Sequence, residues 1–317
     1  MNRYLVLFLL VAIKGFAQVS GCTDSMAKNY NPKATINDGG CVYKKVTTSL
    51  TNSYVLDDKL NETSGLIYFN NRFWTHNDDT DTNLYALDTI NGAIQETYIL
   101  PNVVNKDWEE ISQDENYVYI GDFGNNAQGN RTDLSILRIE KKSLLSRNPI
   151  IDKIEFKYSN QTNFERQFAN KTNFDCEAFI ITQDSIYLFT KEWKSKQTTT
   201  YSLPKTPGKY IAKQKITYNI KGLVTGATYL DSKNILALCG YTRNGKPFVN
   251  LFYDFKNNDF FSANKRKIKL KPRFQQIEGI TTQDGIHYYI TNEHLKFALA
   301  NNLQKIQILD LTKLFKN

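Results

Sequence analysis

Five residues with oxygen-bearing side chains recur along the chain, and together they have the chemistry of a hard-cation site. Each begins a short apolar segment, which is followed by a polar turn and a second, strongly aromatic segment. The five are Ser64, Glu109, Glu177, Thr225 and Glu278, separated by 45, 68, 48 and 53 residues. Carboxylate and hydroxyl oxygens are ligands that calcium accepts in flexible number. The repeat therefore predicts a calcium site, provided that the fold brings the five residues together.

The segments between these residues predict the secondary structure that would bring the five residues together. From about Leu50 onward, short apolar segments alternate with polar turns, and helical periodicity is almost absent. An all-strand repeat of about 50 residues is typical of a β-propeller, in which each copy forms one blade. The first strand of every blade lines the central channel, so the five residues would face one another. We predict an all-β propeller over residues 50–317 with five blades; the alternative is a sixth blade between Ile150 and Phe174.

The last copy lacks a fourth strand, because the chain ends soon after Ile306–Leu309. The segment Thr51–Leu56 is left over before the first copy. We expect this segment to complete the last blade and close the ring.

The three glutamates of the repeat would repel one another without a cation between them. A calcium ion removes that cost, and no Cys or His in the set favours a softer metal. The alternative is that the five residues only begin strands and hydrogen-bond to the next blade.

Residues after the second strand of each copy would surround the mouth of the same channel. Candidates for orienting or deprotonating a water molecule are Asp78, Asp122 and Glu293. Candidates for binding an anionic substrate are Arg131, Lys191, Trp193, Arg243 and Asn292.

Composition narrows the class of protein. The chain has 317 residues, of which 41% are hydrophobic and 23% charged, a balance that excludes disorder, collagen and coiled coil. The formal charge of +8 is modest, so we do not expect a nucleic-acid partner. Three His and four Cys leave few ligands for zinc or haem. No Gly-Lys-Ser/Thr phosphate loop or Gly-x-Ser-x-Gly nucleophile motif is present.

The N-terminus predicts export. Arg3 precedes a ten-residue apolar run, Tyr4–Ile13, which is too short to span a bilayer. We predict a signal peptide over residues 1–18, no transmembrane segment, and a secreted or periplasmic monomer. The alternative is a lipoprotein anchored through Cys22.

A small module is predicted over residues 19–45, held by a disulfide between Cys22 and Cys41. Its oxygen donors either hold a calcium ion or cap turns, and they are Asp24, Asn29, Asn31, Asn37 and Asp38. The module resembles a short Cys-bounded segment of exported Bacteroidetes proteins. Cys176 and Cys239 are either buried free thiols or a second disulfide.

Several motifs of the repeat resemble those of the calcium-activated nucleotidases (apyrases). They are Glu62–Trp74 with Asp78–Thr80, Asp107–Glu109 with Tyr117–Gly121, Cys176–Ala178, and Ile277–Ile280. This resemblance implies a five-bladed propeller with axial calcium that hydrolyses nucleoside di- and triphosphates. The calcium-shell positions of that family fall on Ser64, Glu109, Glu177, Thr225 and Glu278. The segment Asp107–Ile111 is also similar to the acidic motif of phytase-like and lactonase-like secreted propellers.

The chain departs from the nucleotidases after Gly121. Those enzymes carry Gly-Lys-Glu-Trp there, whereas this chain reads Asp122-Phe123-Gly124-Asn125-Asn126, and their long substrate loops have no clear counterpart. We therefore predict a calcium-dependent hydrolase acting on a small phosphate-bearing or ester substrate. The alternative is a non-catalytic extracellular binding module with structural calcium.

Overall fold

The computed structural model describes residues 18–79, 81–297 and 300–315. The predicted signal peptide, residues 1–18, lies outside these ranges apart from its last residue. Strands dominate the described residues; the other regular elements are α1 (Lys141–Leu145), α2 (Thr312–Phe315) and 3-10 turns at Asp58–Leu60 and Asp231–Lys233. The predicted all-β class is confirmed.

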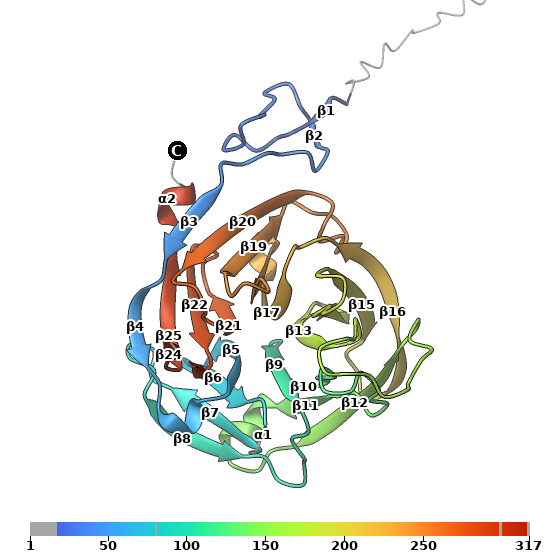
Figure 1. Cartoon of the computed structure of the whole chain (residues 1–317), viewed down its shortest axis with the longest axis vertical. Helices are drawn as coiled ribbons and strands as arrows, with labels where there is room; N and C mark the ends of the chain where they lie inside the picture. The colour runs from blue at the N-terminus through green and yellow to red at the C-terminus, as the bar shows by residue number, and fades with distance from the viewer. Residues whose placement is uncertain (1–17, 80, 298–299, 316–317) are drawn as a thin grey trace, which may run out of the picture.

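The described strands group into five four-stranded antiparallel units (Figure 1). The first contains β5 (Thr63–Phe69), β6 (Arg72–Asn77), β7 (Asn83–Leu87) and β8 (Ile94–Ile99). The second contains β9 (Trp108–Gln113), β10 (Tyr117–Asp122), β11 (Ser135–Glu140) and β12 (Ile151–Tyr158). The third contains β13 (Cys176–Ile181), β14 (Ser185–Thr190), β15 (Thr198–Pro204) and β16 (Gly208–Tyr218). The fourth contains β17 (Leu223–Leu230), β18 (Ile235–Tyr241), β19 (Pro247–Tyr253) and β20 (Asn264–Lys271). The fifth contains β21 (Ile277–Thr282), β22 (His287–Asn292), β25 (Lys305–Asp310) and β4 (Thr51–Val55).

The first strands of the five units form the centre of the molecule. In Figure 1, β5, β9, β13, β17 and β21 surround the middle of the view, and each contacts the next in a closed circuit. We call these the inner strands. The interval between Ile150 and Phe174, where a sixth blade was the alternative, contains β12. This strand belongs to the second unit, so the interval adds no separate sheet.

Pairing at the outside links units that are neighbours. The outer strands β12 and β16 pair in parallel and join the second and third units into one eight-stranded sheet. The strand β3 (Val46–Ser49) adds to the fourth unit by parallel pairing with β20. The next strand, β4, pairs antiparallel with β25, as predicted for the leftover segment. The chain segment 46–55 therefore ties together the fourth and fifth units.

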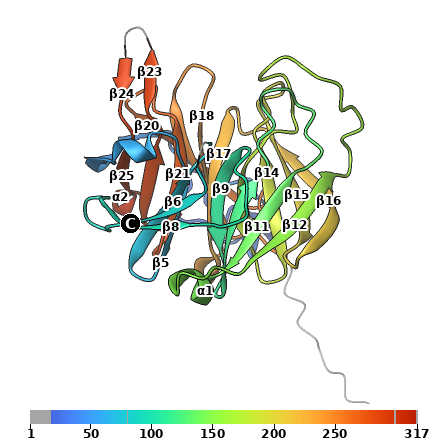
Figure 2. The same cartoon turned by 90° about the horizontal axis from the view of Figure 1, so that it is seen from below.

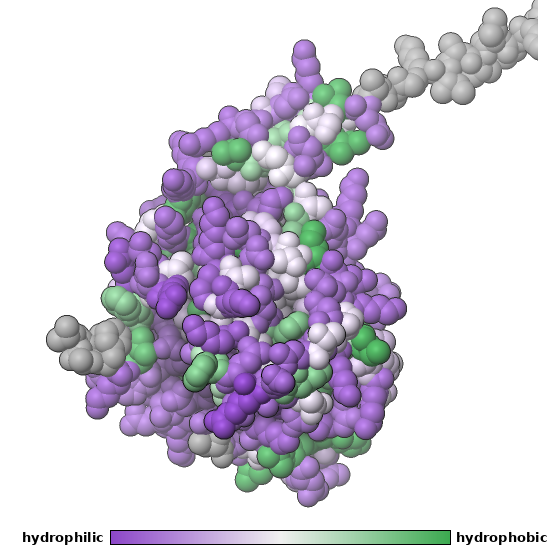
Figure 3. Space-filling model, turned by 45° about the vertical axis from the view of Figure 1, so that its right-hand side comes forward, coloured by the Kyte–Doolittle hydropathy of each residue, from purple (hydrophilic) through white to green (hydrophobic). Residues whose placement is uncertain are grey.

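Each unit is apolar on both faces because each packs between two others. Five buried hydrophobic clusters fill the spaces between successive units, including the space between the fifth and the first. Representative pairs are Trp74 with Ile120, Ile136 with Phe179, Phe189 with Phe252, Val249 with Ile290, and Ile306 with Phe73. Burial on both faces explains the nearly continuous apolar strands of the sequence. The face shown in Figure 3 is mostly hydrophilic, and its hydrophobic side chains lie in small separate groups.

The segment before β3 is a small module on the rim of the fourth unit. It contains the short parallel pair β1 (Ser20–Gly21) and β2 (Ile36–Asn37), and the predicted disulfide between Cys22 and Cys41 is confirmed. Because the sulfur of Cys22 is bonded to Cys41, it offers no free thiol for a lipid anchor. Four oxygen donors of the module each accept the backbone N–H two residues on, which is the turn-capping alternative; they are Asp24, Asn31, Asn37 and Asp38. The fifth, Asn29, accepts from the backbone N–H of Val42 and so links the two ends of the module.

The module is anchored to the sheet units by hydrogen bonds. The Asp24 carboxylate accepts from the hydroxyls of Tyr43, at 2.7 Å, and of Tyr253 in β19, at 2.8 Å. The remaining cysteines, Cys176 and Cys239, are buried free thiols. All helices in the described part of the chain are too short or too polar to span a lipid bilayer.

Candidate metal centre

Four inner strands carry a β-bulge at the residue singled out by the repeat. In β9 the residues on either side of Glu109 pair with consecutive residues of β10, which leaves Glu109 without a partner of its own. The residue left out in the same way is Glu177 in β13, Thr225 in β17 and Glu278 in β21. In β5 the irregularity follows Ser64. A bulge re-aims a side chain and is common beside functional sites.

The two hydroxyl residues of the repeat link neighbouring inner strands. Ser64 Oγ donates to the carbonyl of Glu109 at 2.6 Å, and Thr225 Oγ1 donates to the carbonyl of Ile277. These two hydrogen bonds match the alternative interpretation, in which the repeat residues only bond to the next strand unit and hold no metal.

Two of the glutamates meet in a buried carboxylate cluster. Carboxylate oxygens of Glu109, Asp175 and Glu177 lie within 4.8 Å of one another, and all three residues are buried. Burial and the charge of Glu177 raise the pKa of Glu109 well above its ordinary value. Asp107 adjoins the set: burial and the charge of Asp175 raise the pKa of its carboxyl to about 6.

Lys191, expected to bind substrate, lies inside this cluster. Its Nζ donates to Glu177 Oε2 at 2.7 Å, and the two side chains are 5% and 3% exposed. The ammonium also lies 4.9 Å from the ring centre of Trp193 and 5.4 Å from that of Tyr241. Burial lowers the pKa of Lys191, but the charges around it, Glu177 first, hold it well above its usual value. The chain thus supplies one cation of its own to the cluster.

The loop after β10 fixes the position of the carboxylates. Asp175 accepts hydrogen bonds from the backbone N–H of Asn125 at 2.7 Å and from Trp193 Nε1 at 2.6 Å. At Gly124 an added Cβ would lie 2.1 Å from Glu109 Oε1 and 2.3 Å from Asp107 Oδ2. Only a glycine lets the backbone approach so closely. The segment in which this chain departs from the nucleotidases therefore packs directly against the cluster.

A second carboxylate cluster lies at the same end, where β6 and β22 finish. Oxygens of Glu62, Asp78 and Glu293 lie within 4.8 Å of one another. Burial and the charge of Glu62 raise the pKa of Asp78 to about 7. Asp78 Oδ1 is buried and has no hydrogen-bond partner in the described part of the chain. An orphaned, buried carboxylate oxygen beside two other carboxylates is the donor set expected of a hard cation.

Charges from both clusters act on one another through Glu278, the last glutamate of the repeat. In and beside the two clusters, eight carboxyl groups have a pKa raised mainly by burial, and they are Glu62, Asp78, Asp107, Glu109, Asp175, Glu177, Glu278 and Glu293. In the described residues Lys191 is the ammonium group hydrogen-bonded within this set. One lysine cannot balance eight carboxylates, so the set requires bound cations, bound protons or both.

The other predicted residues have varied surroundings. Asp122 forms an ion pair with Arg131 at 2.8 Å, and Arg131 also donates to the carbonyl of Gly124, so this pair holds the loop in place. Asn292 is fully buried; its amide nitrogen donates to the carbonyls of Glu293 and Leu303, and its oxygen accepts from Gln307. Neither end of that amide is available to a substrate, and Asn292 instead supports the loop of Glu293. Arg243 lies outside both clusters, in a pocket beyond Trp193.

A carboxylate not expected from the repeat occupies the axis itself. The side chain of Glu110 accepts from the backbone N–H of Ile111 at 3.0 Å and of Ala227 at 2.8 Å, which joins β9 to β17. An added Cβ at Gly65 would lie 2.5 Å from Glu110 Oε1. Burial raises the pKa of Glu110 well above its ordinary value, and the two N–H donors oppose that rise.

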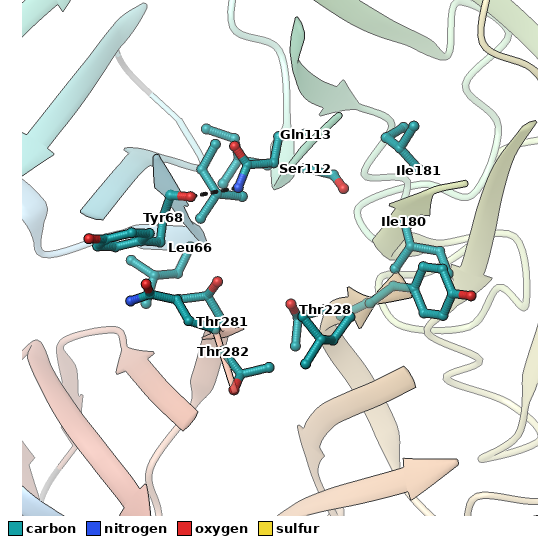
Figure 4. A pocket seen from close by; sticks show the side chains of 15 residues that line it. Leu66, Tyr68, Ser112, Gln113, Ile180, Ile181, Thr228, Thr281 and Thr282 are labelled. Atoms are coloured by element: carbon teal, nitrogen blue, oxygen red, sulfur yellow. Dashed lines mark hydrogen bonds between the residues drawn. The ribbon is translucent and has the colours of Figure 1, made fainter. Parts of the chain in front are cut away.

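The opposite end of the inner strands has different chemistry. A small pocket there is lined by the last residues of all five inner strands, among them Leu66, Ser112, Ile180, Thr228 and Thr281 (Figure 4). Its lining contains neither a carboxylate nor a basic side chain. The charged chemistry is therefore confined to the end where the second strands finish. That end also carries the hairpin of β23 (Leu295–Phe297) and β24 (Ala300–Asn302), which projects beyond the sheets in Figure 2.

The sequence contained a signal for the clustered carboxylates that the repeat did not identify. Asp107 and Asp175 lie two residues before the repeat glutamates, and Glu62 lies two residues before Ser64. Side chains two residues apart on a strand share a face, so these three acids were candidates for the same centre as the repeat residues that follow them. Comparison with protein-family models gives no match for this chain. Comparison with curated proteins gives none either.

Proposed function

We propose that the chain is a secreted, five-bladed β-propeller that binds calcium and hydrolyses a phosphate-bearing or ester substrate at the acidic end. The proposal is supported by the closed circuit of five inner strands and the hydrophobic clusters between successive units. The single observation that carries the function is the pair of carboxylate clusters beside Lys191. The disulfide of the N-terminal module, typical of oxidising compartments, supports secretion. We expect a monomer.

The donor set fits calcium. It consists of carboxylate and hydroxyl oxygen atoms. The residues that would hold the ion are the repeat residues Ser64, Glu109, Glu177, Thr225 and Glu278, together with the acids that precede them. When bound, calcium polarises a phosphoryl or carbonyl oxygen.

Side chains of the second cluster and its neighbours would activate the water molecule and balance the charge of the substrate. Asp78 and Glu293 lie together at the ends of β6 and β22, where either carboxylate would orient or deprotonate a water molecule. Asp122 is held by Arg131, so it is the weakest of the three candidate bases. Lys191 would balance the charge of an anionic substrate, whereas Arg243 lies outside both clusters.

A second candidate is a non-catalytic extracellular binding module in which calcium is purely structural. It is favoured by a specific observation: Ser64 and Thr225 bond to neighbouring strands, and Lys191 is already paired with Glu177. In that case the clusters would stabilise the junction of the inner strands and perform no chemistry.

Hydrolysis assays on the mature protein distinguish the two candidates. Residues 19–317 would be incubated with nucleotides, phytate, phosphomonoesters and lactones, once with calcium and once with a chelator, and released phosphate or acid measured. For a hydrolase we expect turnover that chelator abolishes while the near-UV circular dichroism is retained, and that Asp78→Asn removes. A matched Asp184→Asn change, at an exposed carboxylate in the turn between β13 and β14, should retain turnover. No release from any substrate in calcium would favour the binding module.

A further inference from the structure

A basic pocket lies beside the acidic end, on the far side of Trp193. It encloses about 460 Å³, and its charged lining residues are Lys171, Lys194, Lys196 and Arg243. Its walls also include the rings of Trp193 and Tyr241. The cations come from three separate loops, which precede β13, follow β14 and follow β18. Segments far apart in the sequence therefore converge on one hollow.

These cations lack acidic partners. Neither the pocket lining nor the ion pairs of the described residues supply a carboxylate to any of the four. Burial lowers the pKa of Lys196, and so do the positive charges of Arg243 and Lys171. A neighbouring shallower hollow shares Lys196 and Arg243 and adds Lys221, so the positive surface continues past the pocket. Clustered cations without counter-ions repel one another unless an anion binds between them.

Aromatic rings separate this pocket from the carboxylates. Trp193 donates from its indole to Asp175 on one side and lines the pocket on the other. Tyr241 likewise lies 5.4 Å from the Lys191 ammonium and lines the same pocket. The pocket is therefore distinct from the carboxylate clusters, and the rings of Trp193 and Tyr241 would separate a ligand in it from them.

We propose that this pocket binds a doubly charged oxyanion, such as a phosphate or sulfate group, between Lys171, Lys196 and Arg243. Arginine and lysine are the usual donors to such groups, and a dianion would relieve the repulsion among all four cations. The volume exceeds that of an inorganic anion, so the group would be carried by a larger ligand. The binding does not depend on the proposed hydrolysis, because no residue of the carboxylate clusters takes part.

Calorimetric titration of residues 19–317 with sodium sulfate and with sodium phosphate tests the proposal. Low ionic strength and chelator are used so that screening is small and calcium phosphate cannot form. We expect saturable binding of both dianions and at least tenfold weaker binding of acetate. Tryptophan fluorescence should change with the same midpoint, since Trp193 lines the pocket while Trp74 and Trp108 are fully buried.

Charge reversal locates the site. Arg243→Glu and Lys171→Glu should each weaken sulfate binding at least tenfold, whereas Lys45→Glu, an exposed lysine of the N-terminal module, should change it less than twofold. If Arg243→Glu lowers the melting temperature, Arg243→Gln replaces it. Absence of saturable binding of either dianion, or equal weakening by Lys45→Glu, would overturn the proposal. Failure of the hydrolysis assays would leave this result unaffected.

Discussion

Replacing Lys191 by methionine tests whether the chain neutralises its own carboxylate cluster. The ammonium and the Glu177 carboxylate are 2.7 Å apart, and both side chains are at least 95% buried. Removing the lysine leaves an uncompensated buried charge or forces Glu177 to bind a proton, which costs up to about 3–5 kcal/mol. Methionine keeps the length and apolar contacts of the lysine stem, so cavity effects should be small. We expect Lys191→Met to lower the free energy of unfolding by about that amount in chelator.

Urea denaturation at pH 7.5, followed by circular dichroism, measures the change. The matched control is Lys191→Met combined with Glu177→Gln, which removes both charges and should recover most of the loss. Added calcium should also reduce the cost of Lys191→Met, because a bound cation replaces the missing ammonium. A loss below about 1 kcal/mol in chelator would refute the charged pair. A loss that neither the double variant nor calcium reduces would show that packing, and not charge, is responsible.

Three further predictions follow from other contacts. Gly124→Ala would place a Cβ 2.1 Å from a carboxylate oxygen of the cluster, so it should lower both the melting temperature and the calcium content measured after dialysis. Deleting residues 50–58 removes the strand that pairs with the last strand of the chain, and the truncated protein should aggregate or melt at a lower temperature in a thermal scan. Burial raises the pKa of Asp133, but hydrogen bonds from Lys106 and Arg131 hold it at about 2, so its contribution is present above about pH 4 and is lost as the pH falls toward 2. Asp133→Asn should therefore reduce the loss of stability over that interval in an acid titration.

The sequence predicted the parts of this molecule that depend on periodicity. Alternating apolar segments give the all-β class, and the leftover strand near Thr51 pairs with the last strand as expected. Cys22 and Cys41 form the expected disulfide because a segment of that size has no core of its own. Glu109 and Glu177 meet because corresponding positions of a repeat occupy corresponding places.

The surroundings of individual side chains were not predictable in the same way. From the repeat, Lys191 was one of several residues expected around the mouth of the channel. In the folded chain it is the counter-ion of Glu177. Asn292 was expected to bind substrate, but hydrogen bonds to the next loop occupy its amide. Such pairings depend on which loops meet across units, and a one-dimensional pattern does not contain that information.

The residue that follows each repeat position explains why the carboxylates lie at one end only. Those residues are Gly65, Glu110, Ala178, Gly226 and Gly279, so four of the five are small. At this level the inner strands are so close that an added Cβ at Gly226 would lie 2.3 Å from the carbonyl of Glu278. The space left by the small residues is filled by the one long side chain, that of Glu110, which bonds across the axis to Ala227. Glu110 and the closely packed glycine backbones therefore lie between the acidic end and the pocket of Figure 4. If a cation or substrate binds as proposed, we expect it to reach the carboxylates from the loop side, near Lys191.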